Sequence, residues 1–181
     1  MAQTNLTLRS LGSRAVVGLI ATTILAGTTL AADFIPTTYR VQHAIGKFDD
    51  TSGVMIAYGL RAPRTLRAHH LEVAVGSVVS SDRSAAVVSV GPVWRFPLAA
   101  GRAFVDFGFS PTLLSDSRFD DRELGGNFHF TSSLSIGASF GRFDRYSLAL
   151  RAQHTSNGGL NEDNPGLDMF GLNFAVDFAD F

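Results

Sequence analysis

Apolar residues alternate with small or polar ones along most of the chain after about residue 38. Successive side chains of a strand point to opposite faces, so a period of two predicts strands with one apolar and one polar face. Turn signals divide this pattern into eight predicted strands, and no segment has a convincing helical period. The predicted strands are residues 39–47, 53–61, 67–77, 86–96, 102–112, 127–140, 145–154 and 168–178.

Two arrangements of eight such strands compete. One is a soluble barrel or sandwich with an apolar interior, and the other is an outer-membrane barrel with an apolar exterior. The polar face carries too many ionisable groups for a dry soluble core, because buried charges are costly unless they are paired. These polar-face residues are Glu72, Asp106, His129, Arg151, Gln153, Asn173 and Asp177.

The lengths of the connections favour the membrane barrel. The connections at 62–66, 97–101 and 141–144 are short, whereas those at 113–126 and 155–167 are long. Short periplasmic turns and longer extracellular loops are typical of outer-membrane barrels. Phe181, the last residue, also resembles the terminal aromatic signal of outer-membrane proteins. We therefore predict an all-β fold, an eight-stranded antiparallel transmembrane β-barrel located in the bacterial outer membrane.

The first residues have the pattern of an export signal. Arg9 and Arg14 precede an apolar run over 15–25, and small residues follow at 29–31. This order predicts a signal peptide over 1–32, cleaved near Ala31 or Ala32, and a barrel domain over 33–181. An uncleaved anchor is the competing interpretation, but threonines and a glycine interrupt the apolar run, which is short for a membrane span.

Composition narrows the function classes. The chain has 181 residues, of which 45% are hydrophobic and 17% charged, which indicates one folded domain rather than disorder. The absence of cysteine excludes disulfides, thiolate metal sites and cysteine nucleophiles. A net charge of -1 argues against a nucleic-acid-binding protein.

Residues with catalytic potential gather around the last long loop. His154 and Ser156 have the parity of the apolar, lipid-facing side chains of their strand, and Asp168 has that parity in the next strand. An ionisable group on a lipid-facing surface is a functional-site hypothesis by default. Together the three supply a hydroxyl nucleophile, a base of near-neutral pKa and a carboxylate to orient the base.

The same loop holds candidate oxyanion donors. They are Asn164 and the backbone N–H groups of the Gly158-Gly159 bend, where glycine allows close approach of the main chain. In the competing interpretation, all of these residues are structural. His154 is then a histidine at the barrel rim, residues 156–159 are ordinary turn residues, and Asp168 ends the loop.

Other polar residues are weaker candidates for functional sites. A calcium site over 161–168 is disfavoured, because Pro165 interrupts the ligand pattern. His69 and His70 point to opposite faces, so we expect His70 and Glu72 to lie in the barrel interior and predict no metal site. The long loop at 113–126 contains Arg118 and Arg122, which either balance the acids of that loop or are candidates to meet the phosphate groups of a membrane lipid.

These residues resemble the PagL-type outer-membrane lipid A 3-O-deacylases. The resemblance lies in His-Thr-Ser-Asn-Gly-Gly-Leu at 154–160, in Asn-Pro-Gly at 164–166, and in an acid fourteen positions after the histidine. It covers about the last third of the mature chain at motif level. It implies a serine hydrolase on the outer wall of an eight-stranded barrel, which removes the ester-linked acyl chain at the 3 position of lipid A.

The resemblance assigns roles to individual residues. Ser156 corresponds to the nucleophile, His154 to the general base, Asp168 to the orienting acid and Asn164 to the oxyanion donor, with Gly159 and Asn157 shaping the loop. The family pattern has glutamate where this chain has Asp168. Because aspartate is one methylene shorter, either the strands approach more closely here or the histidine is less well held.

The predicted function is therefore a lipid A 3-O-deacylase that needs no metal or organic cofactor. The expected partners are lipopolysaccharide, the lipids of the outer membrane and a second copy of the chain in a homodimer, with no nucleic acid. A non-catalytic structural or adhesive outer-membrane barrel is the alternative function. A secreted soluble barrel that binds a small apolar ligand is the third.

Overall fold

The computed structural model describes residues 36–46, 51–98, 101–119 and 122–178. The chain divides into two units, Met1–Phe34 and Ile35–Phe181, and everything described below lies in the second. The predicted signal peptide over 1–32 and the predicted aromatic signal at Phe181 lie outside the described residues. Within the described ranges, no helix is long and apolar enough to cross a membrane.

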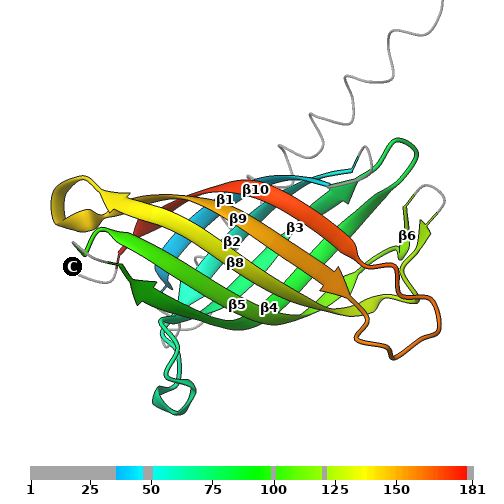
Figure 1. The fold of residues 1–181 in the computed structure, drawn as a ribbon, viewed down its shortest axis with the longest axis horizontal. Helices are drawn as coiled ribbons and strands as arrows, with labels where there is room; N and C mark the ends of the chain where they lie inside the picture. Colours follow the sequence, from blue (N-terminus) through cyan, green and yellow to red (C-terminus); the bar gives the residue numbers. More distant parts are fainter. Residues whose placement is uncertain (1–35, 47–50, 99–100, 120–121, 179–181) are drawn as a thin grey trace, which may run out of the picture. The chain divides into compact units, whose positions relative to one another are not determined.

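Eight long antiparallel strands form a closed barrel, in the order β1-β10-β9-β8-β5-β4-β3-β2 (Figure 1). The sheet closes between the first and last strands, with register pairs from Thr38 opposite Asp177 to Gly46 opposite Met169. The closed barrel confirms the predicted fold class. Its strands are β1 (Pro36–Gly46), β2 (Ser52–Leu60), β3 (His70–Val79), β4 (Ser84–Pro97), β5 (Ala103–Leu114), β8 (Phe128–Phe140), β9 (Tyr146–Ser156) and β10 (Leu167–Asp177).

Two short strands were not predicted, β6 (Arg118–Phe119) and β7 (Arg122–Glu123), which pair with each other within the loop between β5 and β8. Strands of two residues have no detectable alternation, so the pattern cannot reveal them. The β9 strand also extends to Ser156, beyond its predicted end at residue 154, because Phe130 of β8 continues the register opposite Ser156.

The two ends of the barrel differ. The β6–β7 hairpin and the loop 157–166 between β9 and β10 lie together at one end, which we call the loop end (Figure 1). The opposite end, the turn end, carries two 3-10 turns, η1 (Arg64–Leu66) and η2 (Arg142–Asp144). The two longest connections, 115–127 and 157–166, therefore lie at the loop end, as the sequence predicts. At the turn end, the connection 61–69 is longer than the predicted turn at 62–66.

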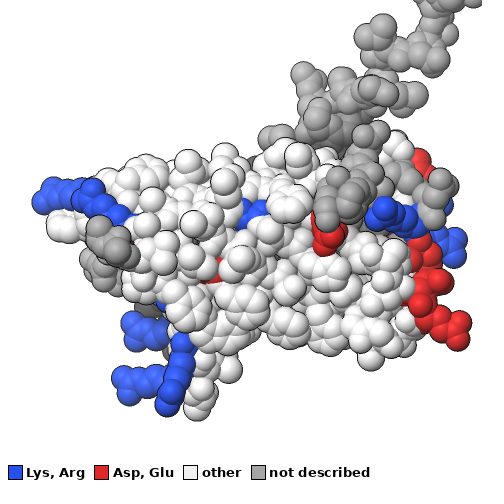
Figure 2. Space-filling model, viewed as in Figure 1, with Lys and Arg blue, Asp and Glu red and all other residues white. Residues whose placement is uncertain are grey.

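The barrel is apolar outside and polar inside. Leu150 on the outer face is 64% exposed, whereas His129 on the inner face is 0% exposed. Figure 2 shows an almost uncharged wall between charged groups at the two ends. A cluster of buried apolar side chains, among them Leu114, Leu124 and Met169, fills the interior toward the loop end. This polarity is that of a membrane barrel and the reverse of a soluble one.

Ion pairs cross the middle of the interior. Glu72 Oε1 lies 2.6 Å from Arg40 Nη2 and 3.7 Å from Arg151 Nη1. Nearer the turn end, Arg95 donates two hydrogen bonds of 2.8 Å to Asp106. Two interior cavities beside these groups have volumes of about 30 and 20 Å³, enough for only one or two waters each.

Glu72→Gln is expected to destabilise the barrel. The neutral amide keeps the shape of the side chain but leaves the buried Arg40 and Arg151 guanidinium groups without their carboxylate. Breaking a buried pair on one side costs about 3–5 kcal/mol. The free energy of unfolding, followed in urea through heat-modifiable gel mobility, should fall accordingly. Glu162→Gln, in the exposed loop 157–166, is the matched control and should leave it unchanged.

Candidate functional site at the loop end of the barrel

His154 and Asp168 meet at the loop end. The two residues are directly opposite each other in the register between β9 and β10. The distance from His154 Nδ1 to Asp168 Oδ1 is 2.7 Å. A carboxylate only accepts hydrogen bonds, so Nδ1–H donates and Nε2 is left to act as a base. The shorter acid reaches the ring because the strands pair at this position.

Both side chains point outward, as their parity predicts. They are 51% and 40% exposed, in the alternation that exposes Leu150 on β9 and Phe170 on β10. The pair therefore lies on the outer wall, above the apolar side chains of the same strands. A wall position is open to a molecule that diffuses within the membrane.

Ser156 lies on the same outer face, two residues after His154, at the end of β9. Two residues of a strand span about 7 Å between Cα atoms. Within the described part of the chain, the structure does not bring the Ser156 hydroxyl into hydrogen-bond contact with His154. Catalytic hydrogen bonds often form only when substrate is bound. The separation of Ser156 from His154 is therefore compatible with Ser156 being a nucleophile in the absence of substrate.

The fully buried Asn157 joins the site loop to its neighbour. Its Nδ2 group donates to the backbone oxygens of Asp163, at 2.7 Å, and of Leu124, at 3.2 Å. The Oδ1 atom accepts from Gly159 N at 2.8 Å. One side chain therefore links three main-chain segments, and a loop-shaping role in catalysis stays a prediction for Asn157.

The candidate oxyanion donors separate into two groups. Gly158 and Gly159 have φ angles of 67° and 82°, which favour glycine. The N–H of Gly159 donates to Asn157, so it is not available for an oxyanion. Asn164 Oδ1 accepts from Asn157 N at 3.0 Å, which fixes the amide and leaves its Nδ2 group as a donor. Gly158 N–H and Asn164 Nδ2 are therefore the better candidates.

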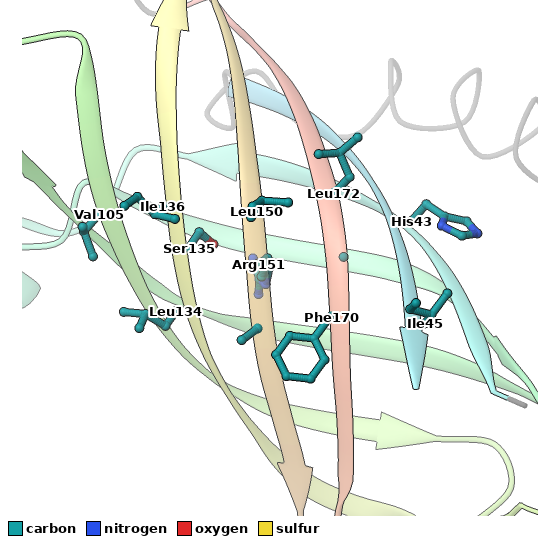
Figure 3. A pocket seen from close by; sticks show the side chains of 12 residues that line it. His43, Ile45, Val105, Leu134, Ser135, Ile136, Leu150, Arg151, Phe170 and Leu172 are labelled. Atoms are coloured by element: carbon teal, nitrogen blue, oxygen red, sulfur yellow. The ribbon is translucent and has the colours of Figure 1, made fainter. Parts of the chain in front are cut away.

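A groove that sequence reasoning missed runs along the outer wall near the site. It has a volume of about 750 Å³ and is lined mostly by apolar side chains of β1, β5, β8, β9 and β10 (Figure 3). Ala152, two residues before His154 on the same face, lies in it, between the larger Leu134 and Phe170 that flank it in the register. The only sign of the groove in the sequence is that Ala152 is small. This becomes informative only when the register shows that the residues beside it are large.

One of the two loop arginines, Arg118, is held by an acid. Arg118 Nε lies 2.6 Å from Glu123 Oε2. Hydrogen bonds from Ser117 and then from Arg118 lower the pKa of Glu123 to about 2. The carboxylate is therefore ionised at neutral pH, and contact of Arg118 or Arg122 with lipid A phosphates stays a prediction. Across the described ranges, no group of three or more potential ligands is placed to hold a metal ion.

Comparisons with known proteins agree with this geometry. A family model described as "Lipid A 3-O-deacylase (PagL)" matches residues 38–177. The chain is 32% identical over 97 residues to the "Lipid A deacylase PagL" of Bordetella bronchiseptica, which covers 50% of this chain and 53% of that protein. It is 28% identical over 91 residues to the protein of the same name from Pseudomonas aeruginosa, covering 49% and 51%. The chain thus spans about half the length of the curated relatives it matches.

A solved structure has the same fold. The "Crystal structure of the outer membrane enzyme PagL" matches with a TM-score of 0.55 and 23% sequence identity, over 77% of this chain and 99% of that one. The predicted eight-stranded barrel agrees with this likeness. Because the family model spans most of the chain, this protein belongs to the lipid A 3-O-deacylase (PagL) family.

Proposed function

We propose that this protein hydrolyses the ester bond of the acyl chain at the 3 position of lipid A. The observation that carries the proposal is the 2.7 Å contact between His154 and Asp168 on the outer wall, with a serine on the same face. A structural barrel has no need of an ionisable pair on its lipid-facing surface, where charge is costly. The family match adds the substrate class.

The reaction begins with attack of Ser156 Oγ on the ester carbonyl. His154 Nε2 takes the hydroxyl proton, and Asp168 stabilises the imidazolium through Nδ1–H. Asn164 Nδ2 and Gly158 N–H donate to the tetrahedral oxyanion. Collapse of this intermediate breaks the bond to the sugar oxygen, which receives the proton from His154. Water, activated by the same imidazole, then releases the fatty acid and restores Ser156.

The groove at Ala152 supports the orientation of the substrate. A chain whose ester lies at Ser156 continues along β9, past Ala152, toward Leu150. The surrounding lipid is as apolar as the groove, so transfer into it gains little hydrophobic free energy. The groove instead selects by shape and holds the ester close to the nucleophile, which is the part of catalysis that positioning supplies.

The test is mass spectrometry of lipid A from an outer-membrane-competent host that produces the unaltered chain or Ser156→Ala. We expect the unaltered chain alone to remove one 3-hydroxyacyl group, since alanine has no nucleophile. Ser139→Ala, at the far end of β8, is a matched control and should keep the activity. Unchanged lipid A in the presence of correctly inserted barrel would reject the proposal and favour the non-catalytic barrel.

A further inference from the structure

Gly166 lies against the imidazole of His154. A Cβ atom at this position would lie 2.6 Å from His154 Cε1, 3.4 Å from Nε2 and 3.5 Å from Nδ1. Real Cβ contacts essentially never fall below 3.0 Å, so any side chain here must displace the ring or the loop. Gly166 is buried, so its bare main chain covers the ring edge between the two nitrogens.

The surroundings restrict how that contact can relax. Leu167, the next residue, is 5% exposed and begins β10 opposite Thr155. Continuing this register by one position places Gly166 opposite Ser156. The 2.7 Å contact with Asp168 links Nδ1 of the ring to β10. Because the His154 side chain is half exposed, whereas Gly166 and Leu167 are buried, the imidazole would be the group to move.

We infer that Gly166 is a positioning residue, whose lack of a side chain leaves the slot in which the His154 ring faces Ser156. This inference rests on the proposed function and adds a residue to it. The φ angle of 68° also favours glycine here, so the effect of the contact must be separated from backbone strain. The chain offers the means to do so.

Gly159 is the matched control. Its φ angle is 82°, and a Cβ atom there would meet nothing within 4 Å. Gly159→Ala therefore carries the backbone strain without the contact. Gly166→Asn is the reverse case, because asparagine tolerates a positive φ better than alanine but still has a Cβ atom. It also serves if Gly166→Ala fails to fold.

The first readout is the ring itself. In the full chain labelled with ¹⁵N-histidine in detergent micelles, the Nδ1–H signal that disappears in His154→Gln reports the hydrogen bond to Asp168. We expect this signal to shift or broaden in Gly166→Ala and in Gly166→Asn, and to stay in place in Gly159→Ala. An unmoved signal in both Gly166 variants, or an equal change in Gly159→Ala, overturns the inference.

The second readout is catalysis on lipid A. Misplacing a base by about 1 Å costs roughly 100-fold in rate, so we expect kcat to fall by about that factor in both Gly166 variants, with KM unchanged. Labelling of Ser156 by a fluorophosphonate probe should slow in parallel. If the ring signal moves but the unaltered chain neither hydrolyses lipid A nor reacts with the probe, the positioning of the ring stands and the proposed function fails.

Discussion

His154→Ala is expected to lower the rate of lipid A deacylation by about 1000-fold or more. In the proposed mechanism, the variant removes the group that takes the Ser156 proton and returns it to the leaving sugar oxygen, and general base catalysis alone contributes about 100- to 10,000-fold. The side chain is half exposed on the outer wall and contributes nothing to the interior. The barrel should therefore keep its heat-modifiable gel mobility while initial rates on purified lipid A collapse.

His69→Ala is the control for that loss. His69 is an exposed histidine just before β3 at the turn end, away from the site loop. Its removal should leave the rates unchanged. Equal activity of His154→Ala and the unaltered chain would remove His154 from the mechanism, and with it the role of Asp168 as the residue that orients it.

Asn157→Ala is expected to release the site loop and abolish most activity. The side chain is 0% exposed, and its loss leaves the buried backbone oxygen of Leu124 without its partner. It also removes the partners of the Asp163 oxygen and the Gly159 N–H, which belong to exposed residues of the loop. An unsatisfied buried group costs about 1–3 kcal/mol, so the loop should open rather than keep this conformation. Hydrogen exchange at residues 157–166 and 124–126 should rise together, while the strands keep their protection.

Asn127→Ala provides the comparison, because Asn127 is an exposed asparagine in the same neighbouring loop. Exchange and activity should match those of the unaltered chain. If Asn157→Ala exchanged no faster than Asn127→Ala, then Asn157 would not be what joins the two loops. A rise limited to 157–166 would show that the link to Leu124 carries little of the stability.

The alternation of apolar and polar residues was the main basis of the fold prediction. Leu148, Leu150 and His154 share one parity, so the strand, its lipid-facing side and the direction of the candidate base all followed from a period of two. Alternation shows on which face of the sheet a side chain lies, but not which residue of the neighbouring strand is opposite it. That Asp168 is directly opposite His154, and so close enough despite its shorter side chain, depends on a register that only the paired strands define.

The remainder of the site depends on contacts between segments distant in sequence. Asn157 reaches Leu124 across more than thirty positions, and no local pattern marks that contact. Gly166 is part of a turn-like Asn-Pro-Gly run, which explains its conformation but not the ring beside it. The groove likewise combines residues of five strands, so it becomes visible only in the closed barrel.

The ion pairs that fill the barrel interior have a consequence for the cell that carries the protein. Among the described residues, Glu72 is held between Arg40 and Arg151, and two cavities beside these groups have volumes of only about 30 and 20 Å³. We therefore expect no continuous file of water between the two ends. The inserted protein should therefore be electrically silent in a planar bilayer. A cell can then carry many copies without weakening the permeability barrier of its outer membrane.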